Sequence, residues 1–181
     1  MRTLLVHPVA LTTAVALTLV VAGCVPAATP ADPAPNPTQP STEPHFASEE
    51  EALAAAEEAY AAYREMQQEI AADQWRDASR IAPFVTEQYL EQALKTAKEI
   101  VESGARLTGA TRITSFELQQ YSPPVLVAYV CHDVSEVRVL DKAGRDVTPP
   151  TRAASNLLEI SFELEGATFL VAGSDLWSEN C

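Results

Sequence analysis

An apolar run near the amino terminus ends in two small residues and a cysteine. This feature most restricts the possible fold, because it indicates how much of the chain is left to form a domain. Residues 9–21 carry no charge, follow the basic Arg2 and lead through Ala22 and Gly23 into Cys24. A basic start, an apolar stretch and small residues at the cleavage point are typical of a signal peptide. The sequence therefore predicts a lipoprotein signal peptide over residues 1–23, with Cys24 as the acylated amino terminus.

Two alternatives exist for this segment. A transmembrane helix needs about 20 consecutive apolar residues, and Pro8 and Pro26 confine the run to fewer. The other alternative is an ordinary signal peptide that leaves Cys24 as a free thiol, but this would not explain why small residues directly precede a cysteine at the cleavage point. Two acyl chains hold a protein stably on a bilayer, since each buried methylene contributes about 0.8 kcal/mol. The sequence thus predicts a lipid anchor, with fatty acids such as palmitate, on the extracytoplasmic face of the cell membrane.

The predicted mature chain divides into a linker and one domain. Residues 24–47 contain a proline every few positions and few large apolar side chains, which favours an extended, disordered spacer. Residues 48–181 have the length of a single domain with one core. The whole chain carries a net charge of -13, and loss of Arg2 makes it -14. This acidity argues against nucleic acid, anionic lipid head groups and acidic polymers as partners.

The three cysteines predict one disulfide bond. Once Cys24 carries lipid, Cys131 and Cys181 remain as a pair in an oxidising compartment. The alternative is two unpaired thiols. Closing a loop of about 50 residues stabilises a domain by about 4 kcal/mol in the chain-entropy model.

Two helices are expected at the start of the domain. Ser48 can cap the first, with Glu51 completing a capping box. Thr86 can cap the second, and Gly104 can end it in a left-handed conformation. Apolar residues at helical spacing predict one buried face on each helix. On the first helix the face comprises Leu53, Ala56, Tyr60, Tyr63, Met66 or Gln67, and Ile70; on the second it comprises Tyr89, Leu90, Ala93, Leu94, Ala97, Ile100 and Val101.

An antiparallel sheet is expected to follow the helices. Leu158, Ile160, Phe162 and Leu164 alternate with polar residues, so one face of that strand should be buried. Residues 125–131 are apolar on both faces and should form a central strand. Further strands are predicted at 113–121, with a bulge, at 137–139 and at 168–172. The predicted fold class is α+β, with N-terminal helices packed on a curved antiparallel sheet.

One segment resembles a known family. The sequence VCHDVSEVRVLD at residues 130–141, followed by Gly144, Val147, Arg152 and Cys181, resembles a group of actinobacterial lipoproteins with the NTF2-like cone fold, also called cystatin-like or SnoaL-like. The resemblance implies a cone of helices and sheet, a bridge between the two cysteines and, in many members of the fold, a homodimer formed through the sheet. The chain differs from the group after Gly166, where members often have tryptophan.

A catalytic site is hard to find in the sequence. Neither a cofactor nor a metal is predicted, because the three histidines are isolated and no phosphate loop is present. Neighbouring residues on a strand point to opposite faces, so a turn-capping Asp133 and a surface His132 are favoured over a catalytic pair. The polar groups that could line a pocket are Tyr60, Tyr63, Tyr89, Tyr129, His132 and Asp133.

The sequence leaves two functions open. The favoured one is a non-enzymatic envelope lipoprotein that binds an envelope protein or a small apolar ligand. The alternative is a small enzyme of the isomerase, dehydratase or hydrolase type that acts in the pocket of the cone. A deep cavity with convergent polar groups would favour the enzyme, whereas a filled cone beside an exposed apolar surface would favour binding.

Overall fold

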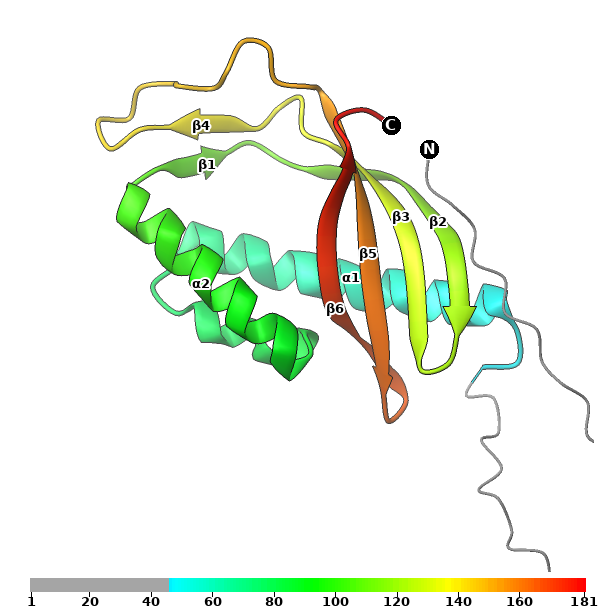
Figure 1. Ribbon diagram of the computed structural model, residues 1–181. Coiled ribbons are helices and arrows are strands. Elements are labelled where there is room, and N and C mark those ends of the chain that lie inside the picture. Colours follow the sequence, from blue (N-terminus) through cyan, green and yellow to red (C-terminus); the bar gives the residue numbers. More distant parts are fainter. Residues whose placement is uncertain (1–45) are drawn as a thin grey trace, which may run out of the picture. The chain divides into compact units, whose positions relative to one another are not determined.

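The computed structural model describes residues 46–181, and within them three helices pack on an antiparallel sheet (Figure 1). This arrangement confirms the predicted α+β class. The predicted signal peptide, Cys24 and the linker up to residue 45 lie outside the described residues. The elements in chain order are α1 (Glu49–Ala72), the 3-10 helix η1 (Ala78–Phe84), α2 (Glu87–Ser103), β1 (Arg106–Thr108), β2 (Arg112–Ser122), β3 (Val125–Asp133), β4 (Arg138–Leu140), β5 (Ser155–Glu165) and β6 (Thr168–Ser178).

Local signals at the helix ends are confirmed. The Ser48 hydroxyl accepts a hydrogen bond from the Glu51 amide at 3.1 Å, and the Glu51 carboxylate accepts one from the Ala47 amide at 2.7 Å. Gly104 ends α2 with φ 65°, a left-handed conformation that glycine adopts without steric cost. Each cap satisfies a backbone group that the helix itself leaves without a partner.

Thr86 gives a direct test of such a cap. Its hydroxyl accepts a hydrogen bond from the Tyr89 amide at 3.3 Å, and its own amide donates to the Val171 carbonyl at 3.0 Å. We expect Thr86→Ala to lower the free energy of unfolding by about 1 kcal/mol, measured by chemical denaturation. Thr86→Ser keeps the hydroxyl and should retain most of that stability. Equal losses in the two variants would contradict the capping role.

The main sheet has the strand order β2-β3-β5-β6, with every neighbouring pair antiparallel. The predicted central strand is confirmed, because β3 pairs with β2 on one side and β5 on the other. The predicted bulge also occurs, as register shifts between Ile113 and Ser115 and between Leu118 and Gln120. The last strand is longer than expected and runs to Ser178, with a register shift opposite Ser161 and Phe162.

The strand predicted at 137–139 does not join the main sheet. β4 pairs instead with β1, residue 107 facing 139, in a separate two-stranded ribbon. Figure 1 shows this β1–β4 ribbon extending from the sheet above the far ends of α1 and α2. Only three residues of each strand pair, so neither alternation nor length in the sequence distinguishes this ribbon from a strand of the sheet.

The core lies between α1 and the main sheet. The largest fully buried side chains of the described residues belong to both layers, and they are Tyr60, Phe162, Ile70, Leu126, Ile160, Val130 and Val171. On β5, Ile160 and Phe162 are buried while Glu163 is exposed, which confirms the predicted two-faced strand. Burial of this apolar surface is the main favourable contribution to folding.

The predicted buried stripe of α2 is only partly correct. Tyr89, Leu90 and Ala93, in the first half of the helix, pack against the core. Leu94 and Val101, by contrast, are 36% and 54% exposed. The helix extends past the main sheet, so its second half has no sheet beneath it. This leaves apolar surface open next to the β1–β4 ribbon.

Candidate functional site

The buried pair of Tyr60 and His132 shows that one expectation was wrong. His132 is 5% exposed, not a surface residue, and its Nε2 lies 3.1 Å from the Tyr60 hydroxyl. The strand continues through Asp133, so alternation places His132 on the same face as Val130 and Ala128, toward α1. The histidine is therefore part of the core.

Burial keeps the Tyr60 and His132 side chains uncharged at neutral pH. Burial, with a smaller effect of the Arg64 charge, lowers the pKa of His132 to about 4. Burial also raises the pKa of Tyr60 well above its usual range. The rings of Phe116 and Phe162 lie 6.0 and 6.1 Å from the Tyr60 ring, centroid to centroid. Aromatic side chains thus fill the space between α1 and the sheet.

Asp133 has the predicted local role. Its carboxylate accepts a hydrogen bond from the Ser135 amide at 2.9 Å, which closes the turn after β3. Hydrogen bonds from Ser135, together with the charge of Arg112, hold the pKa of this carboxyl below its usual range. Because His132 is buried beneath α1 while Asp133 caps a turn, the structure does not bring them together as a catalytic pair.

The other tyrosines lie in two further places. Tyr63 accepts a hydrogen bond from Gln67 at 2.6 Å, and together with Tyr89 it lines a cavity of about 80 Å³ between the three helices. Tyr129 lies on the opposite face of the sheet, where its ring centroid is 5.1 Å from that of Trp177. The six residues singled out by sequence therefore do not form one pocket.

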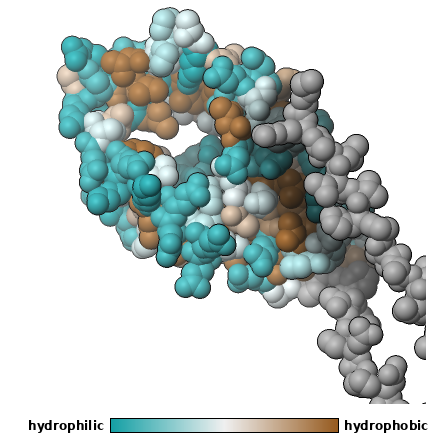
Figure 2. Space-filling model, in the orientation of Figure 1, coloured by the Kyte–Doolittle hydropathy of each residue, from teal (hydrophilic) through white to brown (hydrophobic). Residues whose placement is uncertain are grey.

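A groove lies at the helical end of the domain. It has a volume of about 640 Å³ and lies between the ends of α1 and α2 and the β1–β4 ribbon. Figure 2 shows an opening beneath the ribbon, through which the background is visible, with apolar surface beside it. Its apolar wall comprises Trp75, Ile100, Val101, Leu107 and Leu140. We call this feature the ribbon groove.

The charges around the ribbon groove are of one sign. Arg106 and Lys142 line it, and its lining contains no aspartate or glutamate. A Cβ added to Gly104 would collide with the Lys142 side chain, whose stem therefore lies directly over the end of α2. The lining of the groove is therefore positively charged, although the chain as a whole has a net charge of -13.

Backbone conformation is unusual at one wall of the groove. Gln74 and Trp75 both have φ 59°, a left-handed conformation that costs a non-glycine residue about 1–2 kcal/mol. The Trp75 amide donates a hydrogen bond to the Ile70 carbonyl at 2.9 Å, which holds the turn after α1. As a result, the Trp75 side chain lines both the ribbon groove and the small cavity beside Tyr63.

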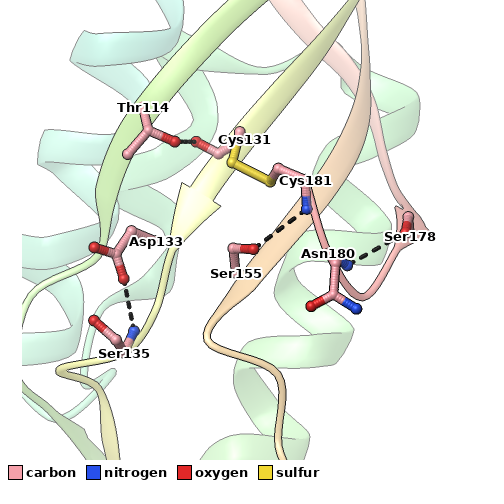
Figure 3. The surroundings of a disulfide bond; sticks show 8 residues. All are labelled: Thr114, Cys131, Asp133, Ser135, Ser155, Ser178, Asn180 and Cys181. Atoms are coloured by element: carbon pink, nitrogen blue, oxygen red, sulfur yellow. Dashed lines mark hydrogen bonds between the residues drawn. A yellow bond between two sulfur atoms is a disulfide. The ribbon is translucent and has the colours of Figure 1, made fainter.

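The predicted disulfide bond is present. Cys131 in β3 and Cys181 after β6 are joined, and their Cα atoms lie 5.9 Å apart (Figure 3). The Cys181 amide also donates a hydrogen bond to the Ser155 hydroxyl at 3.3 Å. The bond therefore connects the central strand to the segment that follows the edge strand, across the start of β5.

Sequence reasoning did not find the ribbon groove. The one indication of it in the sequence is the end of the predicted α2 stripe, where Ile100 and Val101 line the groove while Ala97 is buried as expected. Among the described residues, no helix is long and apolar enough to span a membrane, and no group of three or more histidine, cysteine, aspartate or glutamate side chains could hold a metal ion. Comparison with known proteins finds no family model that matches the chain and no curated relative.

Proposed function

We propose that this protein is a lipoprotein, acylated at Cys24 and held on the extracytoplasmic face of the cell membrane, whose NTF2-like domain binds a small apolar ligand without chemical conversion. The motif before Cys24 supports the anchor. The disulfide bond supports an oxidising compartment. Helices that precede an antiparallel sheet are the element order of the NTF2-like cone.

One observation carries the binding role: the interior is filled and the open space lies elsewhere. In an enzyme with a pocket between helix and sheet, that space would hold the substrate. Here the rings of Tyr60, Phe116 and Phe162 fill it. The ribbon groove, at about 640 Å³, lies within the usual range of about 300–1,000 Å³ for small-molecule sites. The groove is concave, so a small ligand can contact more of its lining than the flat surface of a partner protein could.

Binding can be tested with a neutral solvatochromic dye. The protein would be the mature chain, secreted with Cys24→Ala so that no acyl chain is present. We expect saturable binding of one dye per chain, read by fluorescence. Val101→Glu places a charge on the groove wall and should weaken binding at least tenfold. Val147→Glu is a matched control, because Val147 is 50% exposed but does not line the groove. Equal binding by both variants would contradict the proposal.

The anchor has a separate test. Cells fed an alkyne-tagged fatty acid should incorporate the tag into the wild-type protein, and Cys24→Ala should lose it because the acceptor sulfur is gone. The wild-type protein should sediment with membranes, and mass spectrometry should place its first residue at Cys24. A mature protein that begins upstream of Cys24, or carries no fatty acid, would overturn the proposed location.

A further inference from the structure

Among the described residues, most other basic side chains of the domain form ion pairs, and the two in the ribbon groove do not. Six described basic residues form ion pairs with carboxylates, and they are Arg76, Arg80, Lys98, Arg112, Arg138 and Arg145. Neither Arg106 nor Lys142 forms an ion pair with a described carboxylate. Negative partial charge at the end of α2 favours Lys142 nearby, but it does not account for a groove lining that lacks acidic residues altogether.

The two cations lie at one rim of the groove. The Lys142 stem covers Gly104, and the Arg106 guanidinium is close to Gly144, where an added Cβ would be 3.8 Å from its Nη2. Both side chains therefore belong to the region where the end of α2 meets the turn after β4. Together they bring two positive charges and several N–H donors to the lining of the groove.

The rest of the lining is uncharged and mostly apolar, with Gln74 and Thr108 as its polar residues. Val101 and Leu107 are 54% and 59% exposed, which is high for side chains of this kind. Trp75 adds an aromatic surface, and its left-handed backbone is the kind of local strain that proteins retain at functional sites. The groove thus combines apolar side chains with two basic ones.

We propose that the ribbon groove binds a single-chain lipid with an anionic head group. The acyl chain lies along Trp75, Val101 and Leu107, and the head group is held by Arg106 and Lys142. This inference rests on the proposed function, because it assigns a ligand class to the same groove. The net charge of the chain argues against anionic lipid head groups as partners. The groove is different, since its lining contains no acidic residue that would repel an anion.

The test is displacement of the neutral dye from the mature, non-acylated chain. The competitors share a sixteen-carbon chain and are palmitate, palmitoyl lysophosphatidate and monopalmitoylglycerol, each below its micelle concentration. We expect the two anions to displace the dye at concentrations at least tenfold lower than the neutral lipid. An acidic amphipathic peptide, which carries similar charge without an acyl chain, should displace it poorly.

Charge-neutralising variants separate the head-group contacts from the apolar wall. In Arg106→Gln/Lys142→Gln, the preference for anionic over neutral lipids should fall to less than threefold. This preference is a ratio measured within one variant, so a change in its dye affinity does not affect it. Arg76→Gln/Lys95→Gln removes the same charge outside the groove lining and should keep the preference.

Each outcome of this experiment has one meaning. Equal displacement by the anionic and neutral lipids, or an unchanged preference in Arg106→Gln/Lys142→Gln, would overturn the head-group assignment while leaving the apolar site intact. Displacement by the acidic peptide but not by the lipids would overturn the proposed occupant. Failure of the dye itself to bind would instead refute the proposed function.

Discussion

Replacing both half-cystines, in Cys131→Ser/Cys181→Ser, is expected to lower the free energy of unfolding by about 4 kcal/mol. The bond joins residues with a sequence separation of 50, so its loss increases the conformational entropy of the unfolded chain. It also frees the segment after β6, an edge strand with only one neighbour in the sheet. Urea denaturation of the secreted, non-acylated protein measures the change.

A reductant gives the matched control for this double variant. Wild-type protein unfolded in the presence of dithiothreitol should reach the same stability as Cys131→Ser/Cys181→Ser, and the reductant should leave the variant unchanged. Ser155→Ala removes only the hydroxyl that accepts from the Cys181 amide. We expect it to cost about 1 kcal/mol. A double variant that loses no more than Ser155→Ala would contradict a major role for the disulfide bond.

The second large effect is a loss of stability on acidification that comes from His132. Its pKa is about 4 in the folded protein, against an ordinary value of 6.5. Between these values the unfolded chain binds a proton that the folded protein does not, so stability falls as the pH falls from about 6.5 to about 4. At about 1.36 kcal/mol per pKa unit, the loss amounts to about 3 kcal/mol.

The comparison protein for this measurement is Tyr60→Phe/His132→Leu. Removing both partners leaves no buried polar group without a hydrogen bond, so the variant should be close to wild type at pH 7 and more stable than it by up to about 3 kcal/mol near pH 4, where only the wild type has lost stability through His132. Asp133, Asp141 and Asp146 have lowered pKa values and also lose stabilisation in acid. They do so in both proteins, and their effect cancels in the difference.

Tyr60→Phe alone isolates the hydrogen bond. It leaves the buried His132 ring without its partner, and we expect a loss of about 1–3 kcal/mol at pH 7. If the stability difference between wild type and Tyr60→Phe/His132→Leu stays constant from pH 7 to pH 4, His132 does not titrate as described. Urea unfolding at half-unit pH steps provides the data.

The parts of the fold that could be predicted from sequence depend on local interactions. Ser48, Thr86 and Gly104 act within a few residues of their own positions, so their chemistry alone indicates where helices begin and end. The alternation of β5 reflects a sheet with one covered face. The β1–β4 ribbon could not be predicted in this way, because three-residue strands carry too little pattern to specify their partners.

The candidate site depends on long-range structure, which explains why sequence reasoning did not find it. The ribbon groove combines the end of α1, the end of α2, β1 and β4, and none of these contains a recognised motif. Apolar spacing predicted that Val101 would be buried, but spacing does not reveal where the sheet ends. The predicted strand ends at residue 131, whereas β3 continues through Asp133, and this extension places His132 on the face of the sheet that faces the core.

The length of α1 has a consequence for access. The helix has 24 residues, and at about 1.5 Å per residue it is about 36 Å long. Phe46, which stacks on Phe169 with ring centroids 5.4 Å apart, precedes the start of this helix, whereas Ala71 and Ala72 at its other end line the ribbon groove. A sensor chip coupled directly at the start of the described domain would therefore be attached at the end opposite the groove. Incoming molecules would approach from the free side, and immobilisation in that orientation would not obstruct a binding assay.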